Sequence, residues 1–200
     1  TRTMSGLIDE VCFYNRSLSQ NEIRELMHLT RNHTTVDPSL KSYYQFNEIG
    51  QGIYDRAGTV NGILNGSAAH VLSTAPVGSG NSDRMTITSS GLKNFPNEGL
   101  SMTFPVGTLP NGEICVTRLN LQPDSVPTNR TFANTAKKYW IINNYGTTNA
   151  FTSVSSMTMT GYGSISTNQA LSPRKFKLFN RSTGGFLASA WTKIDSAYAV

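Results

Sequence analysis

Apolar and polar residues alternate over short stretches along most of the chain, which is the period of a half-buried β-strand. In the first half this pattern predicts strands over residues 6–14 and 40–46 and at Ile63-Leu64. The second half shows no helical spacing, and turn residues and prolines separate its apolar stretches. There the pattern predicts seven strands, over 85–88, 100–104, 113–119, 139–145, 154–160, 176–180 and 186–191. Such a series is typical of a sandwich of antiparallel sheets.

One helix is expected, near the start of the chain. Ser19-Gln20-Asn21-Glu22 reads as a capping box, in which the serine hydroxyl and the glutamate carboxylate each satisfy a free backbone N–H group. Ile23, Leu26 and Met27 follow at helical spacing and form one apolar stripe. Asn32 or the Asp37-Pro38 pair would end this helix.

The composition supports an all-β fold. The 200 residues include 22 Ser, 23 Thr, 18 Asn and 17 Gly, whereas charged residues make up 14%, against about 25% in an ordinary soluble domain. Threonine suits a pleated surface, and Gly and Asn suit turns. This composition argues against a helical bundle, and 9 Phe and 8 Tyr argue against a disordered chain.

The net charge of +5 comes from the second half, whose densest basic stretch contains Arg174, Lys175, Lys177 and Arg181. Basic residues interleaved with aromatic ones could bind nucleic acid. We favour a strand with one solvated basic face, because no nucleic-acid-binding motif accompanies the stretch. No apolar window is long enough for a membrane span, and no signal-peptide pattern opens the chain. We expect a fragment of a longer precursor, with any export signal outside it.

Residues 73–82 are rich in Pro, Gly and Ser and form the best candidate boundary. We therefore expect two domains, residues 1–78 and residues 79–200. The two cysteines, Cys12 and Cys115, could form a bridge between these halves or could both be small buried hydrophobic residues. We expect two free thiols.

Two segments of the first half carry a family resemblance. Gly6 to Ser19 (GLIDEVCFYNRSLS), followed by Glu22-Ile23, resembles the closing segment of laminin-G-like, concanavalin-A-like jelly-roll domains, with Cys12 where the family usually has arginine. The stretches 40–50 and 54–66 resemble the opening segment of the same family, although Thr59-Val60 replaces its usual polar pair.

A closing segment before an opening one resembles tandem jelly rolls in surface proteins of bacteria that use type IX secretion. The resemblance covers roughly residues 5 to 80 and implies a secreted or cell-surface protein. Residues 139–146 are similar to part of a β-domain that follows such modules. We therefore expect an incomplete jelly-roll segment with one short helix, followed by an antiparallel β-sandwich.

The resemblance also implies calcium, which jelly rolls of this family often hold near the meeting of their first and last strands. It places Asp9 and Asp55 as the first candidate ligands and Glu48 as the next. The structural alternative is that Asp9 ends a strand and Asp55 caps a turn. Asp9 and Glu10 are adjacent, so on a strand they would point to opposite faces and could not act together on one substrate.

We expect no enzymatic activity. No nucleophile, phosphate-binding or dinucleotide-binding motif is present, and His28, His33 and His70 do not have the spacing of metal ligands. Exposed aromatic rings could instead stack on sugars. Trp140 and Trp191 are expected to fill the core instead. Tyr145, with Asn143 and Asn144 beside it, is the first candidate for ligand binding, and further candidate rings are Tyr43, Tyr44 and Tyr162.

These observations lead to one hypothesis with two alternatives. We expect a non-enzymatic secreted or cell-surface module for adhesion, binding or surface assembly. Its partner would be a glycan or a protein on a surface, or copies of itself, and not nucleic acid. The first alternative is a carbohydrate-binding accessory module of a polysaccharide-degrading enzyme. The second is a subunit of an extracellular filament, in which an edge strand completes a neighbouring sandwich.

Overall fold

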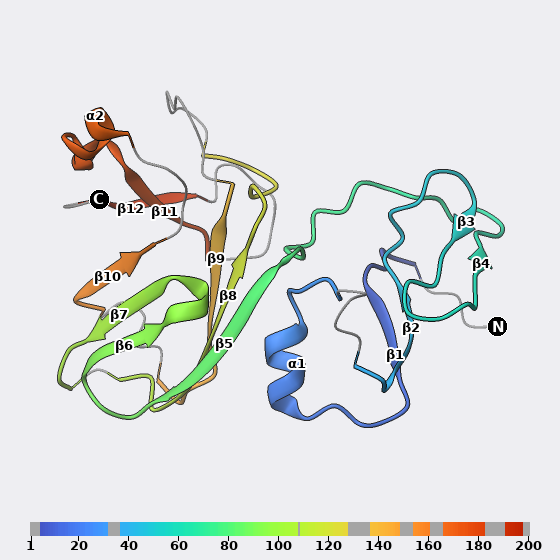
Figure 1. The fold of residues 1–200 in the computed structure, drawn as a ribbon, viewed down its shortest axis with the longest axis horizontal. Coiled ribbons are helices and arrows are strands. Elements are labelled where there is room, and N and C mark those ends of the chain that lie inside the picture. The colour runs from blue at the N-terminus through green and yellow to red at the C-terminus, as the bar shows by residue number, and fades with distance from the viewer. Residues whose placement is uncertain are drawn as a thin grey trace.

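The structure, a computed structural model, describes residues 5–31, 37–107, 109–127, 137–148, 154–160, 166–182 and 191–197. It is built mainly of short antiparallel strands, which confirms the all-β prediction. Two parts lie side by side along the longest axis of the molecule (Figure 1). Strands β1 to β4 lie at one end, strands β5 to β12 at the other, and α1 lies between the two (Figure 1).

The first part contains two small sheets. β1 (Val11–Tyr14) pairs antiparallel with β2 (Leu40–Tyr44). β3 (Gly52–Ile53) pairs antiparallel with β4 (Gly62–Ile63). The strand predicted over 6–14 forms only from Val11, because Glu10 has a φ of 52° and leaves the extended conformation.

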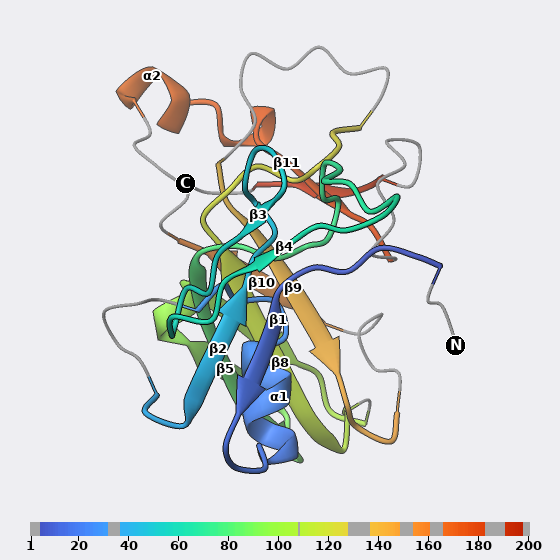
Figure 2. The ribbon, with the colours of Figure 1, turned by 90° about the vertical axis from the view of Figure 1, so that its right-hand side faces the viewer.

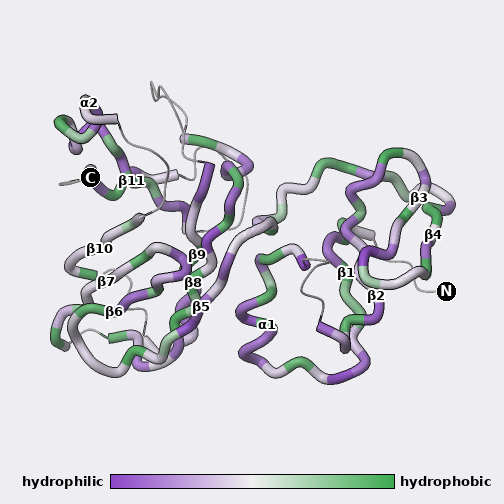
Figure 3. Tube along the Cα trace, viewed as in Figure 1, coloured by the Kyte–Doolittle hydropathy of each residue, from purple (hydrophilic) through white to green (hydrophobic). Residues whose placement is uncertain are grey.

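The predicted helix is confirmed as α1 (Gln20–Leu26), but its predicted end at Asn32 or at Asp37-Pro38 was wrong, because the helix ends at Leu26 with Met27 as its C-cap. Ser19 is its N-cap, and the capping box is complete. The Ser19 hydroxyl accepts the Glu22 N–H, and the Glu22 carboxylate accepts the Ser19 N–H at 2.8 Å. α1 is largely hydrophilic along its length (Figure 3). Its packing against the second part therefore relies on polar contacts as well as on apolar area.

The second part is a sandwich of two three-stranded antiparallel sheets. One sheet has the order β5-β8-β9 and the other the order β10-β7-β6, and a further pair, β11 and β12, lies beside them. The bounds are β5 (Gly80–Ile87), β6 (Gly91–Phe95), β7 (Leu100–Phe104), β8 (Gly112–Leu119), β9 (Tyr139–Asn144), β10 (Ser156–Met159), β11 (Lys177–Asn180) and β12 (Thr192–Ser196).

The apolar core lies between these two sheets. Trp140 and Met85 are half-buried against it. Because side chains alternate between the two faces of a strand, Ile114 and Val116 of β8 point into this core, whereas Cys115 and Thr117 point to the opposite face. The buried core residues are Ile87, Phe95, Leu100, Met102, Phe104, Ile114 and Val116.

The sequence pattern missed several elements of the second part. β6 and β12 were not predicted, and β5 begins at Gly80, inside the segment expected to be a linker. A short helix, α2 (Thr167–Ala170), has its own capping box between Ser166 and Gln169, so the expectation that this half has no helix was wrong. Two 3-10 turns, η2 (Pro96–Glu98) and η4 (Pro173–Lys175), were also missed. The strand predicted over 186–191 lies almost wholly outside the described residues.

The outer face of the sheet β5-β8-β9 carries polar side chains and packs against α1, as the views of Figure 1 and Figure 2 agree. Arg24 of α1 donates to Glu113 of β8 at 2.7 Å, and Arg84 of β5 donates to the same carboxylate at 3.1 Å. Arg84 also pairs with Glu25 at 2.5 Å. Two arginines and two carboxylates thus alternate in one network, the α1 ion-pair network.

A buried thiol lies beneath α1. Cys115 is 0% exposed, and its Sγ lies 3.4 Å from the backbone carbonyl oxygen of Arg24. Cys12 is half-buried, and both cysteines are free thiols, as expected. Burial raises the pKa of the Cys115 thiol, so it stays protonated and unreactive at neutral pH.

Residues 73–79 connect the two parts. They lead from the first part to β5 without joining a sheet (Figure 1). Gly78 nevertheless bridges Leu29, just after α1, so the connection is tied to the first part. Whether the parts are independent domains stays a prediction. Among the described residues, no helix has the length and apolar character needed to cross a membrane.

Candidate functional site

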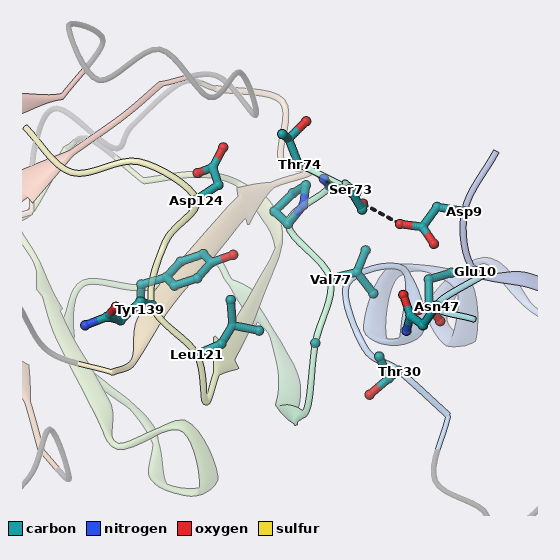
Figure 4. A pocket seen from close by; sticks show the side chains of 14 residues that line it. Asp9, Glu10, Thr30, Asn47, Ser73, Thr74, Val77, Leu121, Asp124 and Tyr139 are labelled. Atoms are coloured by element: carbon teal, nitrogen blue, oxygen red, sulfur yellow. Dashed lines mark hydrogen bonds between the residues drawn. The ribbon is translucent and has the colours of Figure 1, made fainter. Parts of the chain in front are cut away.

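A cleft of about 360 Å³ lies where the two parts meet. Six separate segments line it, and they come from both parts of the molecule (Figure 4). Tyr139 and Leu121 lie on one side, Asp9 and Asn47 lie on the other, and Val77 of the connection lies between them (Figure 4). The complete lining is Asp9, Glu10, Thr30, Asn47, Ser73, Thr74, Ala75, Pro76, Val77, Gly78, Leu121, Gln122, Asp124 and Tyr139.

Both Asp9 and Glu10 line this cleft, although we expected them to point to opposite faces of a strand. The expectation was wrong because the left-handed backbone of Glu10 interrupts the alternation that a strand would impose. Asp9 accepts a hydrogen bond from the hydroxyl of Ser73, which fixes the connection against the start of β1.

Tyr43 holds the Glu10 carboxylate in place. The Tyr43 hydroxyl donates to Glu10 Oε2, and the Tyr43 side chain is buried, so the carboxylate has a fixed position. Burial raises the pKa of Glu10, the tyrosine hydrogen bond lowers it, and the nearby charge of Asp9 raises it, with a net upward shift. Two carboxylates, those of Asp9 and Glu10, therefore lie at one wall of the cleft.

The opposite wall comes from β9 and the loop after β8. Tyr139 is the first residue of β9, and burial followed by the charge of Asp124 raises the pKa of its hydroxyl. The hydroxyl is therefore a neutral donor at neutral pH. Asp124 accepts a hydrogen bond from Arg181 at 2.9 Å, which neutralises its charge. Arg181 in turn lies 4.9 Å above the ring of Trp191.

The floor of the cleft is the connection itself, which residues 28–30, just after α1, hold in place. Thr30 N–H donates to the carbonyl of Gly78 at 3.0 Å, and Gly78 N–H donates to the carbonyl of His28 at 3.1 Å. His28 Nδ1 lies 3.0 Å from the carbonyl oxygen of Pro76, and His28 Nε2 lies 3.3 Å from the amide nitrogen of Asn143. Because both ring nitrogens have partners in the neutral form and burial lowers the pKa of His28, the ring is uncharged at neutral pH.

The cleft can therefore bind a polar ligand through an aromatic ring and several hydrogen-bonding groups. Carboxylate and amide oxygens accept hydrogen bonds from hydroxyl groups, and serine, threonine and tyrosine hydroxyls can donate or accept. No lysine or arginine lines it among the described residues. This lining fits a ligand rich in hydroxyl groups better than an anion.

The carboxylates expected to bind calcium do not gather in one place. Asp55 is 8% exposed, and its Oδ1 accepts the backbone N–H groups of Tyr43, Ala57 and Gly58 at 3.0, 3.0 and 2.9 Å. Glu48 pairs with Arg56 at 2.9 Å, and Asp9 lies in the cleft. Asp55 therefore caps a turn, which was the structural alternative for this residue.

Because Asp55 and Glu48 already accept N–H groups, their arrangement does not fit a calcium site shared with Asp9. Within the described part of the chain, no group of three or more His, Cys, Asp or Glu side chains could hold a metal ion. Calcium at these positions stays a prediction, for which chelation is the test.

The residues expected to bind a ligand around Tyr145 lie at the interface with α1. The guanidinium of Arg24 lies 4.0 Å from the centre of the Tyr145 ring, and the Tyr145 hydroxyl donates to the Met27 sulfur at 3.4 Å. Asn143 contacts His28, and Asn144 accepts the Gly146 N–H at 2.8 Å. One face of the Tyr145 ring is thus already covered by a cation from the same chain.

The other aromatic candidates differ in their burial and in their contacts. Tyr43 is 1% exposed, so the expectation that its ring is an exposed platform was wrong. Trp140 is half-buried against the core and donates from Nε1 to the carbonyl of Glu98 at 2.7 Å. Trp191 is half-buried beside Arg181, at the pair of strands formed by β11 and β12. Tyr162 lies outside the described residues.

The sequence pattern did not indicate Tyr139, Asp124 or Ser73 as parts of one site. They belong to segments separated by many residues, and no single motif links the three. Only their arrangement around the connection brings them together.

In three comparisons, the chain matches no model of a known protein family, no curated protein and no solved structure.

Proposed function

We propose that this chain is a non-enzymatic binding module of a secreted or cell-surface protein, and that the cleft between its two parts binds a glycan. The observation that supports the proposal is the lining of the cleft, in which Tyr139 faces Asp9 and Asn47 across the connection (Figure 4). Sugar rings stack on aromatic faces, while amide, carboxylate and hydroxyl groups bind their hydroxyls.

The way in which these groups are held also supports binding. Tyr43 holds the Glu10 carboxylate, and Arg181 holds the Asp124 carboxylate. A ligand that meets groups already in position does not have to order them, which lowers the entropic cost of binding. Adhesion to a glycan surface and delivery of a degrading enzyme both need this kind of glycan binding. Glycan binding at the cleft is therefore consistent with the main hypothesis and with the accessory-module alternative.

A glycan-binding screen with matched variants tests the proposal. Tyr139→Ala removes the ring from the cleft, and we expect binding of any selected glycan to weaken by at least about tenfold, corresponding to about 1.4 kcal/mol. Tyr54→Ala is the control, because Tyr54 is 52% exposed and does not line the cleft. The control should bind as the unchanged protein does.

Two results would contradict the proposal. The first is a screen in which the unchanged protein binds no glycan, or in which Tyr139→Ala and Tyr54→Ala bind equally well. The second concerns the absence of enzymatic activity. Release of reducing ends from a bound glycan, lost in Asp9→Asn, would assign hydrolysis to the cleft.

A further inference from the structure

Asparagine is followed directly by glycine at three places in the chain, and the structure treats these pairs differently. They are Asn61-Gly62, Asn65-Gly66 and Asn111-Gly112. A backbone nitrogen can attack the side-chain amide carbon of the asparagine before it, and glycine hinders this attack least because it has no side chain. Each pair therefore carries the atoms for the same reaction, and the surrounding structure decides which pair reacts.

Asn65 and Gly66 lie in an exposed turn after β4. The N–H of Gly66 donates to Asn65 Oδ1 at 2.7 Å, so the side-chain amide lies over the peptide group that would attack it. Gly66 belongs to no strand and has a φ of 65°, and a Cβ atom there would have no neighbour within 4 Å. The hydrogen bond that closes the turn, from the Ala68 N–H to the Asn65 carbonyl oxygen, is long at 3.4 Å. The turn thus has room to change its backbone angles.

Asn61 is held by contacts that Asn65 lacks. Its Oδ1 accepts the backbone N–H of Asp55 at 3.0 Å, which ties the side-chain amide to the loop that Asp55 caps. Gly62 lies in β4 and pairs with Ile53 of β3, so the sheet fixes its backbone. Attack by the Gly62 nitrogen would require both contacts to open.

The pair Asn111-Gly112 is confined by the sandwich. Gly112 is the first residue of β8 and pairs with Ile87 of β5. A Cβ atom at Gly112 would lie 2.5 Å from the Cα of Gly146, so the backbone is closely packed at this point. Ring closure there would require local opening of the sheet, which costs free energy.

We infer that Asn65 is a site of spontaneous deamidation and that it reacts before the other two pairs. The Gly66 nitrogen attacks Asn65 Cγ and loses its proton, a C–N bond forms, and the side-chain nitrogen leaves as ammonia. The product is a cyclic imide. Water then adds to either carbonyl carbon of the imide and opens the ring to aspartate or to isoaspartate. The net reaction consumes a water molecule and releases ammonia, and it needs no other reactant.

The products differ from Asn65 in charge and, for isoaspartate, in the length of the main chain. Both place a negative charge in the exposed turn. Isoaspartate also adds a carbon atom to the main chain, between β4 and the connection to the second part. Asn65 does not line the cleft, so the inference does not depend on the proposed glycan binding.

Peptide mapping of the folded protein over time tests the site. The protein is kept in mildly alkaline buffer, because the attacking nitrogen must lose a proton, and its peptides are analysed by mass spectrometry for deamidation and for isoaspartate. We expect Asn65 to react at least about tenfold faster than Asn61 or Asn111, which corresponds to a barrier lower by about 1.4 kcal/mol.

Two controls separate the effect of the structure from that of the sequence. In urea the three pairs lose their surroundings, so their rates should become similar, because glycine follows each asparagine. Asn65→Gln keeps the amide but lengthens the side chain, so that the ring it would form is larger and closes more slowly. Deamidation at position 65 should then be lost, while Asn61 and Asn111 keep their slow rates.

The inference fails on any of three results. The first is that Asn61 or Asn111 reacts as fast as Asn65 in the folded protein. The second is that Asn65 stays intact in the folded protein and reacts only in urea, which would show that the turn protects it. The third is a product that contains aspartate without isoaspartate. Water would then attack the side chain directly, and the Gly66 nitrogen would have no part in the reaction.

Discussion

At the scale of single residues, Asp55 shows how one carboxylate shapes a loop. Burial raises its pKa, but backbone N–H groups from Tyr43, Gly58 and Ala57 lower it, and the net effect moves the pKa from 3.8 to about 2. Gly58 allows this approach, because a Cβ atom there would lie 2.7 Å from Asp55 Oδ2 and 2.7 Å from the Lys41 carbonyl oxygen. The spacing of Asp55 and Gly58, three residues apart, thus has a local structural cause.

Asp55→Ala is expected to destabilise the protein by about 2 kcal/mol at neutral pH, since hydrogen bonds to a charged group contribute that much. The folded-state pKa lies below the unfolded one, so this stability is present above pH 3.8 and is lost as the pH falls towards 2. Urea unfolding at several pH values between 6 and 2 measures it. An acid dependence as steep in Asp55→Ala as in the natural sequence would contradict the prediction.

At the scale of elements, α1 binds the second part through the α1 ion-pair network. Its central carboxylate, Glu113, is 12% exposed in its side chain and faces both Arg24 and Arg84. Partly buried pairs are screened less than surface pairs, so they contribute more. The ion pair of Arg16 with Glu22 has side chains 38% and 35% exposed and therefore contributes little.

We expect Glu113→Gln to weaken the docking of α1 by about 1–2 kcal/mol, because two arginines then lose their shared counter-charge. Hydrogen exchange of the α1 amides should become faster, with little change in the core strands β7 and β8. Arg16→Met is the matched control and should change stability by less than about 1 kcal/mol. Equal exchange of α1 in both variants would count against the network.

At the scale of the whole molecule, one sheet has two packing partners. The inner face of β5-β8-β9 packs in the sandwich core, and its outer face carries Glu113, Cys115 and Thr117 towards α1. Thr117 is 0% exposed and its hydroxyl lies 2.9 Å from that of Ser82. The position of the cleft therefore depends on how α1 packs on the outer face of this sheet. The chain runs from the end of α1 to Thr30, and Thr30 lines the cleft.

Much of the fold could be predicted from local patterns. The Ser19–Glu22 spacing gave the helix start, and β7 has the predicted bounds, because both signals depend only on neighbouring residues. The long-range contacts could not be predicted. Tyr145 has an aromatic side chain at a strand end, but only the packing of α1 decides that Arg24 covers its ring. The cleft could not be predicted either, because it forms only where segments that are distant in the sequence meet.

The reactivity of the buried Cys115 thiol under α1 reports on the movement of this helix. Cys115 is 0% exposed and lies against the backbone of α1, so a thiol reagent reaches it only when the helix moves away. In a Cys12→Ser background, the rate of thiol modification therefore reports how often the two parts separate at that surface. Adding Glu113→Gln should accelerate the modification by about tenfold, which corresponds to about 1.4 kcal/mol. Unaltered rates would mean that Cys115 becomes accessible by opening of the sandwich itself and not by movement of the helix.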